Sequence, residues 1–362
     1  MAKKERHIFA AGNTARGYKT LYDSVLEGLD RVYILSGVVE GITSDLIEAI
    51  GKEMSRKTNE IEWIHSPFMK GQYDGVIFPE WKAAIVDGSY PRIWRPSAPG
   101  VTEINVNLQT SVGVDHLAQY KEQIAAWYEE IFRKSEEAYA AYGEALRIHD
   151  EWEAPYIAHL DREKANKVTE EVLTLFFGEE NLEKRSKVRR MYLGAATPDG
   201  PVDHIMKLTD QMQKRYFIKG RPGSGKSTML KKLVTEAEKR GFDAEVYHCG
   251  LDPHSLDMVI IPEKGLAIFD STAPHEYFPS KETDEVIDMY ERAIEQGTDE
   301  AYEAELTDIK ARYRQKMQEA TALLAAAKEL RQQLNNVYVE VTDQPRLKAV
   351  AQAIMSRLDR MA

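Results

Sequence analysis

An α/β protein with two tandem three-layer αβα domains is predicted from a repeat in the chain and from the alternation of its elements. Alternating strand and helix character in each half is typical of a mostly parallel sheet covered by helices on both faces. Each half then continues into a long helical arm. The 362 residues also exceed the roughly 250 to 300 residues at which a single core stops growing.

The repeat is clearest in the middle of each half, where Ile64–Glu80 aligns with Tyr247–Glu263 without a gap. Self-similarity of this kind indicates the domain organisation before any single motif is interpreted. The charged stretch 178–190 cannot bury a core, so we predict domains at 1–184 and 185–362. The matched positions are His65 and His248, Asp74 and Asp257, Pro79 and Pro262, Glu80 and Glu263, Asp87 and Asp270, Pro91 and Pro274, and Pro96 and Pro279.

Apolar residues at steps of three and four predict one long amphipathic helix in each arm. These residues are Ile124, Trp127, Ile131, Ala138, Tyr142, Ala145, Ile148 and Trp152 in the first arm, and Leu306, Ile309, Tyr313, Ala320, Leu324, Ala327, Leu330 and Leu334 in the second. Each arm is expected to end in a short strand, at 156–158 and 337–341, and then a last helix, at 164–176 and 347–358.

A glycine-rich segment in the second half carries the most specific motif. The pattern Gly220-x4-Gly225-Lys226-Ser227 follows an apolar strand and precedes a helix. In this setting it predicts a P-loop, because the glycines let successive N–H groups point at a phosphate and the helix adds its positive end. We expect ATP to be held by Gly220, Arg221, Pro222, Gly223, Ser224, Gly225, Lys226, Ser227 and Thr228.

Two side chains are the candidate catalytic residues, Lys226 on the β and γ phosphates and Asp270 on a magnesium ion. Asp270 ends a buried strand, and the hydroxyl of Ser227 would complete the magnesium shell. Fast ATPases carry a water-activating glutamate after this aspartate. Because Ser271 and Thr272 follow Asp270 instead, fast hydrolysis is disfavoured. A slow ATPase, a kinase and a nucleotide switch all stay open.

The corresponding turn of the first half lacks the phosphate-binding lysine. It reads Ser36–Asp45, with Ile42 in the place of Lys226 and with Glu40 inside the turn. A carboxylate about 4 Å from a phosphate charge would cost on the order of 4 kcal/mol at an effective dielectric constant near 20. We therefore expect a degenerate first copy that holds no triphosphate, although Asp87 persists there.

Comparison of the two halves also sorts the remaining candidates. Residues kept in both halves are assigned to the fold, namely Thr14 and Thr197, His65 and His248, Asp74 and Asp257, and Glu80 and Glu263. Residues found only in the second half are candidates for an acceptor site, namely Asp252, His254, Thr272 and His275. The arms are expected to pack as an amphipathic pair, and the alternative is a lid that carries Arg312, Arg314 or Arg331 to the phosphates.

The composition narrows the function classes. The 48 basic and 59 acidic residues leave a net charge of -11, which disfavours a nucleic-acid partner. A single cysteine, Cys249, allows no internal disulfide or thiolate zinc cluster and is typical of the reducing cytoplasm. No segment approaches the roughly 20 apolar residues of a membrane helix. We therefore predict a cytoplasmic protein without a membrane partner.

These residues resemble an uncharacterised bacterial family of tandem P-loop NTPases, loosely described as ATPases or nucleotide kinases. The resemblance covers nearly the whole chain, through segments 12–17, 219–228, 247–250 and 269–275. It implies ATP binding and no particular reaction. The first half in this family can also carry a working P-loop, from which this chain departs at Glu40 and Ile42.

Two functions follow from these patterns. The first is an ATP-binding, magnesium-dependent P-loop NTPase that hydrolyses ATP slowly or transfers its phosphoryl group to a small-molecule or protein acceptor. Its first half would be a degenerate regulatory copy. The second is a nucleotide-dependent switch or scaffold, in which ATP moves the helical arms to engage a protein partner.

Overall fold

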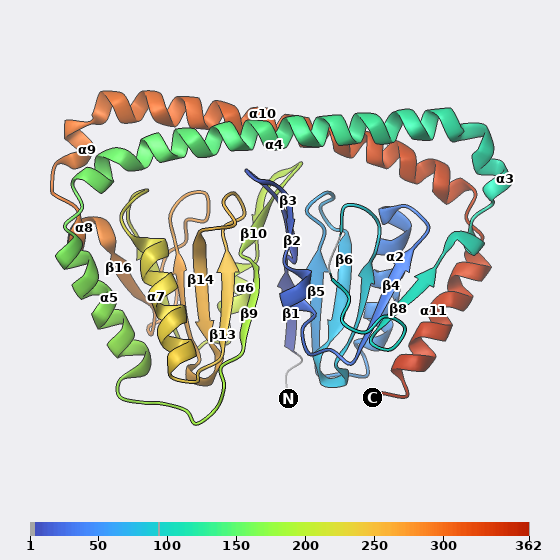
Figure 1. The fold of residues 1–362 in the computed structure, drawn as a ribbon, viewed down its shortest axis with the longest axis horizontal. Helices are drawn as coiled ribbons and strands as arrows, with labels where there is room; N and C mark the ends of the chain where they lie inside the picture. Colours follow the sequence, from blue (N-terminus) through green and yellow to red (C-terminus); the bar gives the residue numbers. More distant parts are fainter. Residues whose placement is uncertain (1–3, 93–94, 362) are drawn as a thin grey trace.

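The structure, a computed structural model that describes residues 4–92 and 95–361, is an α/β protein with two six-stranded sheets and long helices (Figure 1). The first sheet has the order β1-β5-β6-β7-β4-β8 and consists of β1 (Lys4–Ile8), β4 (Arg31–Ser36), β5 (Glu60–His65), β6 (Tyr73–Phe78), β7 (Ala83–Asp87) and β8 (Glu103–Asn107). The second has the order β16-β12-β15-β14-β13-β9 and consists of β9 (Val188–Tyr192), β12 (Lys214–Lys219), β13 (Ala244–His248), β14 (Leu256–Ile261), β15 (Leu266–Asp270) and β16 (Glu285–Asp288).

Both sheets are mixed but mostly parallel, with the same strand order. In each sheet one strand, β6 or β14, runs antiparallel to its two neighbours, and the remaining pairs are parallel. Each half also has a two-stranded hairpin next to its first strand. The hairpins consist of β2 (Ala11–Thr14) with β3 (Gly17–Thr20), and of β10 (Gly194–Thr197) with β11 (Gly200–Asp203).

Two helices of 38 residues each, α4 (Lys121–Ala158) and α10 (Glu303–Glu340), lie side by side across the top of both sheets (Figure 1). The other helices are α1 (Tyr22–Val25), α2 (Glu40–Met54), α3 (Val114–Leu117), α5 (Arg162–Phe177), α6 (Ile205–Thr209), α7 (Lys226–Lys239), α8 (Met289–Ala293), α9 (Thr298–Ala301) and α11 (Gln344–Leu358). Within the described ranges, none of the helices is both long and apolar enough to cross a membrane.

The short strands expected at 156–158 and 337–341 are wrong, because both segments continue the long helices. Their β-branched and aromatic residues favour a strand only weakly by themselves. Here their side chains extend the apolar face of a helix instead. Tyr156 packs with Ile294 and Leu306, and Tyr338 packs against the core of the first sheet.

The long helices cross from one sheet to the other, so the last helix of each half lies on the opposite sheet. Helix α5 packs on α7 of the second sheet, where Val172 and Phe176 join the core. Helix α11 packs on α2 of the first sheet, where Leu347 and Ile354 are buried. Figure 1 shows this exchange at the two ends of the molecule. The domain boundary between residues 184 and 185 stays a prediction.

The faces of the two sheets opposite α2 and α7 share one apolar core. This core contains strand residues of both sheets together with the short helices α1 and α6. Helix α1 of the first half contacts β9, and α6 of the second half contacts β1. The edge strands also meet directly, because the amide of Tyr192 donates a 3.0 Å hydrogen bond to the carbonyl of Phe9.

Buried ion pairs are exchanged across this junction. Arg189 of β9 pairs with Glu62 of β5 at 2.6 Å, and Arg6 of β1 pairs with Glu245 of β13. Arg6 also lies 3.0 Å from Glu62 and donates to the hydroxyl of Tyr247. Burial opposes ionisation of Glu62, but the two guanidinium groups outweigh burial and lower the pKa of Glu62 to about 2. The charged network therefore connects the two halves.

Replacing Glu62 with glutamine should destabilise the protein at pH 7 by about 3–5 kcal/mol, since two partly buried guanidinium groups would lose a shared, buried carboxylate. The folded pKa of Glu62 lies below the ordinary value of 4.5, so its ionic contribution is present above pH 4.5 and is lost as the pH falls towards 2. The difference between wild type and Glu62→Gln in urea unfolding should therefore shrink over this range. Glu60→Gln, on the same strand but at the surface, is the control. If both variants lost the same free energy of unfolding, Glu62 would not be the carboxylate that stabilises the two guanidinium groups.

Candidate functional site

A cavity of about 1790 Å³ lies at the edge of the second sheet where β12 and β15 end. All nine residues of the glycine-rich segment Gly220–Thr228 line it, and so does Asp270. Helices α4 and α10 supply further lining residues, although α4 begins over the first sheet. The cavity is therefore enclosed by elements from both halves of the chain.

The backbone of the glycine-rich loop needs residues without a side chain. Gly220, Gly223 and Gly225 have φ angles of 153°, 74° and 90°, which L-amino acids with side chains rarely adopt. A Cβ atom on Gly220 would lie 2.7 Å from the Oγ of Ser224, and one on Gly223 would lie 2.9 Å from the carbonyl oxygen of Glu153 in α4. Directly after this loop, α7 begins at Lys226 with its free N–H groups. The loop and the start of α7 can thus present main-chain donors to an anion.

Lys226 is nearly buried and folded back onto the loop. Its Nζ donates to the carbonyl of Arg221 at 2.9 Å and lies 3.5 Å from the carboxylate of Asp270. The other oxygen of Asp270 accepts from the amide and hydroxyl of Thr272. The Oγ of Ser227 accepts from the amide of Leu256 at 3.0 Å. A hydroxyl and a carboxylate in one cavity are hard oxygen ligands of the type that Mg²⁺ binds, so the residues fit this ion.

Arg221 anchors the loop to the start of the second arm. Its guanidinium pairs with Asp299 at 2.7 Å and lies over the ring of Tyr290. Asp299 also accepts a 2.6 Å hydrogen bond from the hydroxyl of Tyr156 in α4. These contacts hold the loop against α8 and α9, and Asp299 of α9 connects it to α4.

A second carboxylate stands beside Asp270. Because β14 runs antiparallel, its first residues lie at the edge where β15 ends, and Asp257 faces the cavity there. Burial, followed by the charge of Asp270, raises the pKa of Asp257 to about 6. Burial also raises the pKa of the neighbouring Cys249 thiol, so this cysteine stays protonated and unreactive.

His275 lines the same wall of the cavity. Its Nδ1 lies 2.7 Å from Asp203, which also accepts from the hydroxyl of Tyr277. Burial opposes protonation of His275, but Asp203 outweighs it and raises the pKa of His275. The carboxylates of Asp257 and Asp270 also lie near the imidazole and favour its protonation.

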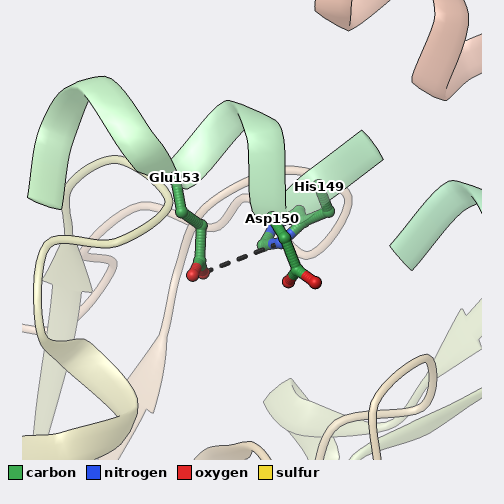
Figure 2. A group of neighbouring side chains, drawn as sticks. All are labelled: His149, Asp150 and Glu153. Atoms are coloured by element: carbon green, nitrogen blue, oxygen red, sulfur yellow. Dashed lines mark ion pairs between the residues drawn. The ribbon is translucent and has the colours of Figure 1, made fainter. Parts of the chain in front are cut away.

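The roof of the cavity carries a polar group from the first arm. Figure 2 shows His149, Asp150 and Glu153 on α4, with a 3.6 Å ion pair between Nδ1 of His149 and Glu153. One ligand atom from each lies within 4.8 Å of the others, a set of types that can hold a divalent cation. Burial lowers the pKa of His149, although Glu153 and Asp150 oppose this shift.

The corresponding position of the first half is filled by side chains. Arg92 lies 2.7 Å from Asp74, 3.2 Å from Asp87 and 3.2 Å from Glu40. From the far end of α10, Arg331 reaches Glu40 at 2.7 Å. This buried network of two cations and three carboxylates occupies the space in front of α2. The carboxylate of Glu40 therefore pairs with the guanidinium groups of both Arg92 and Arg331.

The structure brings together the residues that the sequence predicts. Lys226, Ser227 and Asp270 line one cavity with the acceptor candidates Asp252, His254, Thr272 and His275. Asp257 was assigned to the fold because Asp74 persists in the other half, yet it lines the same cavity. Of the three arginines named for a lid, Arg314 lines the cavity and Arg312 and Arg331 do not. His149, Asp150 and Glu153 of the roof lie far away in sequence, and no local pattern marks them. Comparisons with protein-family models, curated proteins and solved structures found no match.

Replacing Asp257 with asparagine should stabilise the protein near pH 7. The folded pKa of about 6 lies above the ordinary 3.8, so ionising Asp257 costs stability above pH 6, and this cost disappears as the pH falls below 3.8. Asp257→Asn should gain roughly 1–3 kcal/mol at pH 7.5 and close to nothing at pH 4 in urea unfolding. The exposed Asp210→Asn should change little at either pH. A difference that does not vary with pH would contradict the assignment.

Proposed function

We propose that the chain is an ATP-binding, magnesium-dependent P-loop NTPase made of two P-loop-type domains, with nucleotide bound in the second half alone. One observation carries the proposal: the positive-φ glycine loop, Lys226, Ser227 and Asp270 converge on one cavity at the ends of neighbouring parallel strands. A site that combines main-chain donors, one ammonium group and two oxygen ligands suits a phosphate chain with its metal ion.

The residues have distinct roles in this proposal. The amides of the loop and of the first turn of α7 bind the phosphate oxygens, and Lys226 exchanges the carbonyl of Arg221 for the β and γ phosphates. Ser227 and Asp270 hold Mg²⁺, which neutralises charge on the phosphates when bound. Since Ser271 and Thr272 follow Asp270, where the usual hydrolytic glutamate is missing, the site supports slow hydrolysis or phosphoryl transfer to an acceptor.

The first half serves as a degenerate regulatory copy in this account. Arg92 and Arg331 already neutralise Glu40 and fill the space that a phosphate would need. Arg331 belongs to α10, whose opposite end lines the cavity of the second half. Helix α10 thus contacts both the filled position of the first half and the cavity of the second half.

A nucleotide-dependent switch is the second candidate, and the contact between α4 and the loop favours it. Glu153 and Ile157 of α4 lie directly on Gly223. A nucleotide that changes the loop must therefore be accommodated by α4, and α4 extends to the first sheet. Movement of α4 would then change the surface that a partner protein recognises.

Lys226→Ala should weaken binding of a fluorescent ATP analogue with Mg²⁺ by about ten- to a hundredfold, because a charge-assisted hydrogen bond contributes about 1.5–3 kcal/mol. Lys239→Ala is the matched control, since Lys239 lies at the exposed far end of the same helix and, among the described residues, forms an ion pair with Glu236 alone. Unchanged affinity in Lys226→Ala would contradict the proposal.

Phosphate release and limited proteolysis separate the two candidates. A phosphotransferase should form ADP faster when its acceptor is added from a panel of nucleosides, nucleotides and proteins. A switch should show a rate that no acceptor raises, together with a change in the protease sensitivity of α4 and α10 when ATP is added. ADP formation that depends on DNA or RNA would contradict both candidates.

A further inference from the structure

Two cations on α10 face the glycine loop from the other side of the cavity. Lys310 and Arg314 are one helical turn apart, so they project from the same face of α10, and both line the cavity. The volume of about 1790 Å³ exceeds the roughly 300–1,000 Å³ of a pocket for one small molecule. The cavity therefore has room for a second ligand next to a nucleotide.

Within residues 4–92 and 95–361, neither Arg314 nor Lys310 has a hydrogen bond or ion pair, and the Lys310 ammonium lies over the ring of Trp152. Two residues earlier, Arg312 lies outside the cavity and pairs with Glu151 at 2.7 Å and with Asp308 at 2.8 Å. Arg331 is likewise paired, with Glu40. Of the three arginines of α10, the unpaired one is therefore Arg314, which lines the cavity.

The first half provides an internal comparison. The arm helices align with a constant offset, so Tyr128 and Phe132 of α4 occupy the positions of Lys310 and Arg314. Both aromatic side chains are about half exposed, at 49% and 54%. The cations occur only above the intact loop, whereas helix packing alone tolerates aromatic residues at these positions. A requirement of the second cavity, and not of the fold, explains the two charges.

We propose that Lys310 and Arg314 bind a second, anionic substrate, a phosphate monoester that accepts the phosphoryl group of ATP. This inference rests on the proposed function. In the transfer, an ionised oxygen of the monoester forms a bond to the γ phosphorus, the bond between that phosphorus and the bridging oxygen breaks, and ADP leaves with the electron pair. Because the attacking oxygen is already ionised at neutral pH, the step needs no general base.

This acceptor class also accounts for the residue that follows Asp270. A hydroxyl or water nucleophile would profit from a carboxylate base at that position, where the chain has Ser271 and Thr272. An anionic nucleophile instead needs its charge neutralised as it approaches the triphosphate. A guanidinium and an ammonium group supply this neutralisation.

Binding of inorganic phosphate to the full-length protein tests the inference. The loop is first saturated with Mg²⁺ and the non-hydrolysable analogue AMPPNP, and binding of radiolabelled phosphate is then followed by equilibrium dialysis. We expect one phosphate per chain while the γ position is occupied. Arg314→Ala and Lys310→Ala should each lower the affinity for this phosphate at least tenfold and leave the affinity for AMPPNP within twofold of the wild type. Arg312→Ala, next to Arg314 but already paired, should change neither.

Three results would overturn the inference. Phosphate that binds with ADP but not with AMPPNP would place Arg314 on the γ phosphate of the nucleotide itself. Phosphate binding that is absent, or insensitive to both variants, would remove the second subsite. Failure of AMPPNP to bind in the first titration would identify the proposed function as the faulty step, and the inference would fall with it.

Discussion

The contact between the glycine loop and the backbone of α4 determines how this molecule is organised around its cavity. Gly223 can lie against the carbonyl of Glu153 only because it has no side chain and adopts a positive φ angle. Through this contact a helix that begins over the first sheet becomes the roof of a cavity in the second. It places His149, Asp150 and Glu153 opposite Lys226 and Asp270.

The same arrangement recurs in the first half with a different outcome. There α10 lies on α2 so closely that a side chain at Gly41 would collide with Asn335. Arg331 enters from this helix and completes a buried ion network with Glu40 and Arg92. Burial of such a network is tolerated because every charge has an opposite partner nearby. Helices α4 and α10 thus cover both the position in the first half that side chains fill and the open cavity in the second half.

Residues that are close along the chain or are placed by strand order meet in one cavity as the sequence predicts, and their role in binding stays a prediction. The loop, Lys226 and Ser227 are contiguous, and Asp270 follows from the end of a buried strand. The direction in which a long helix leaves its own sheet is not encoded locally, so the exchange of α5 and α11 and the position of His149 could not be predicted. Persistence in both halves is a poor guide for Asp257, since Asp74 forms an ion pair with Arg92, whereas Asp257 forms none in the part of the chain that the structure describes.

The number of nucleotides bound per chain tests the central claim most directly. Calorimetric titration of Mg²⁺-ATP into the wild-type protein should give one site per chain, because the loop of the second half is the proposed triphosphate site and the first half is filled by Arg92, Arg331 and their carboxylates. A stoichiometry of zero would contradict the assignment of the glycine loop, and a stoichiometry of two would contradict the closed first half.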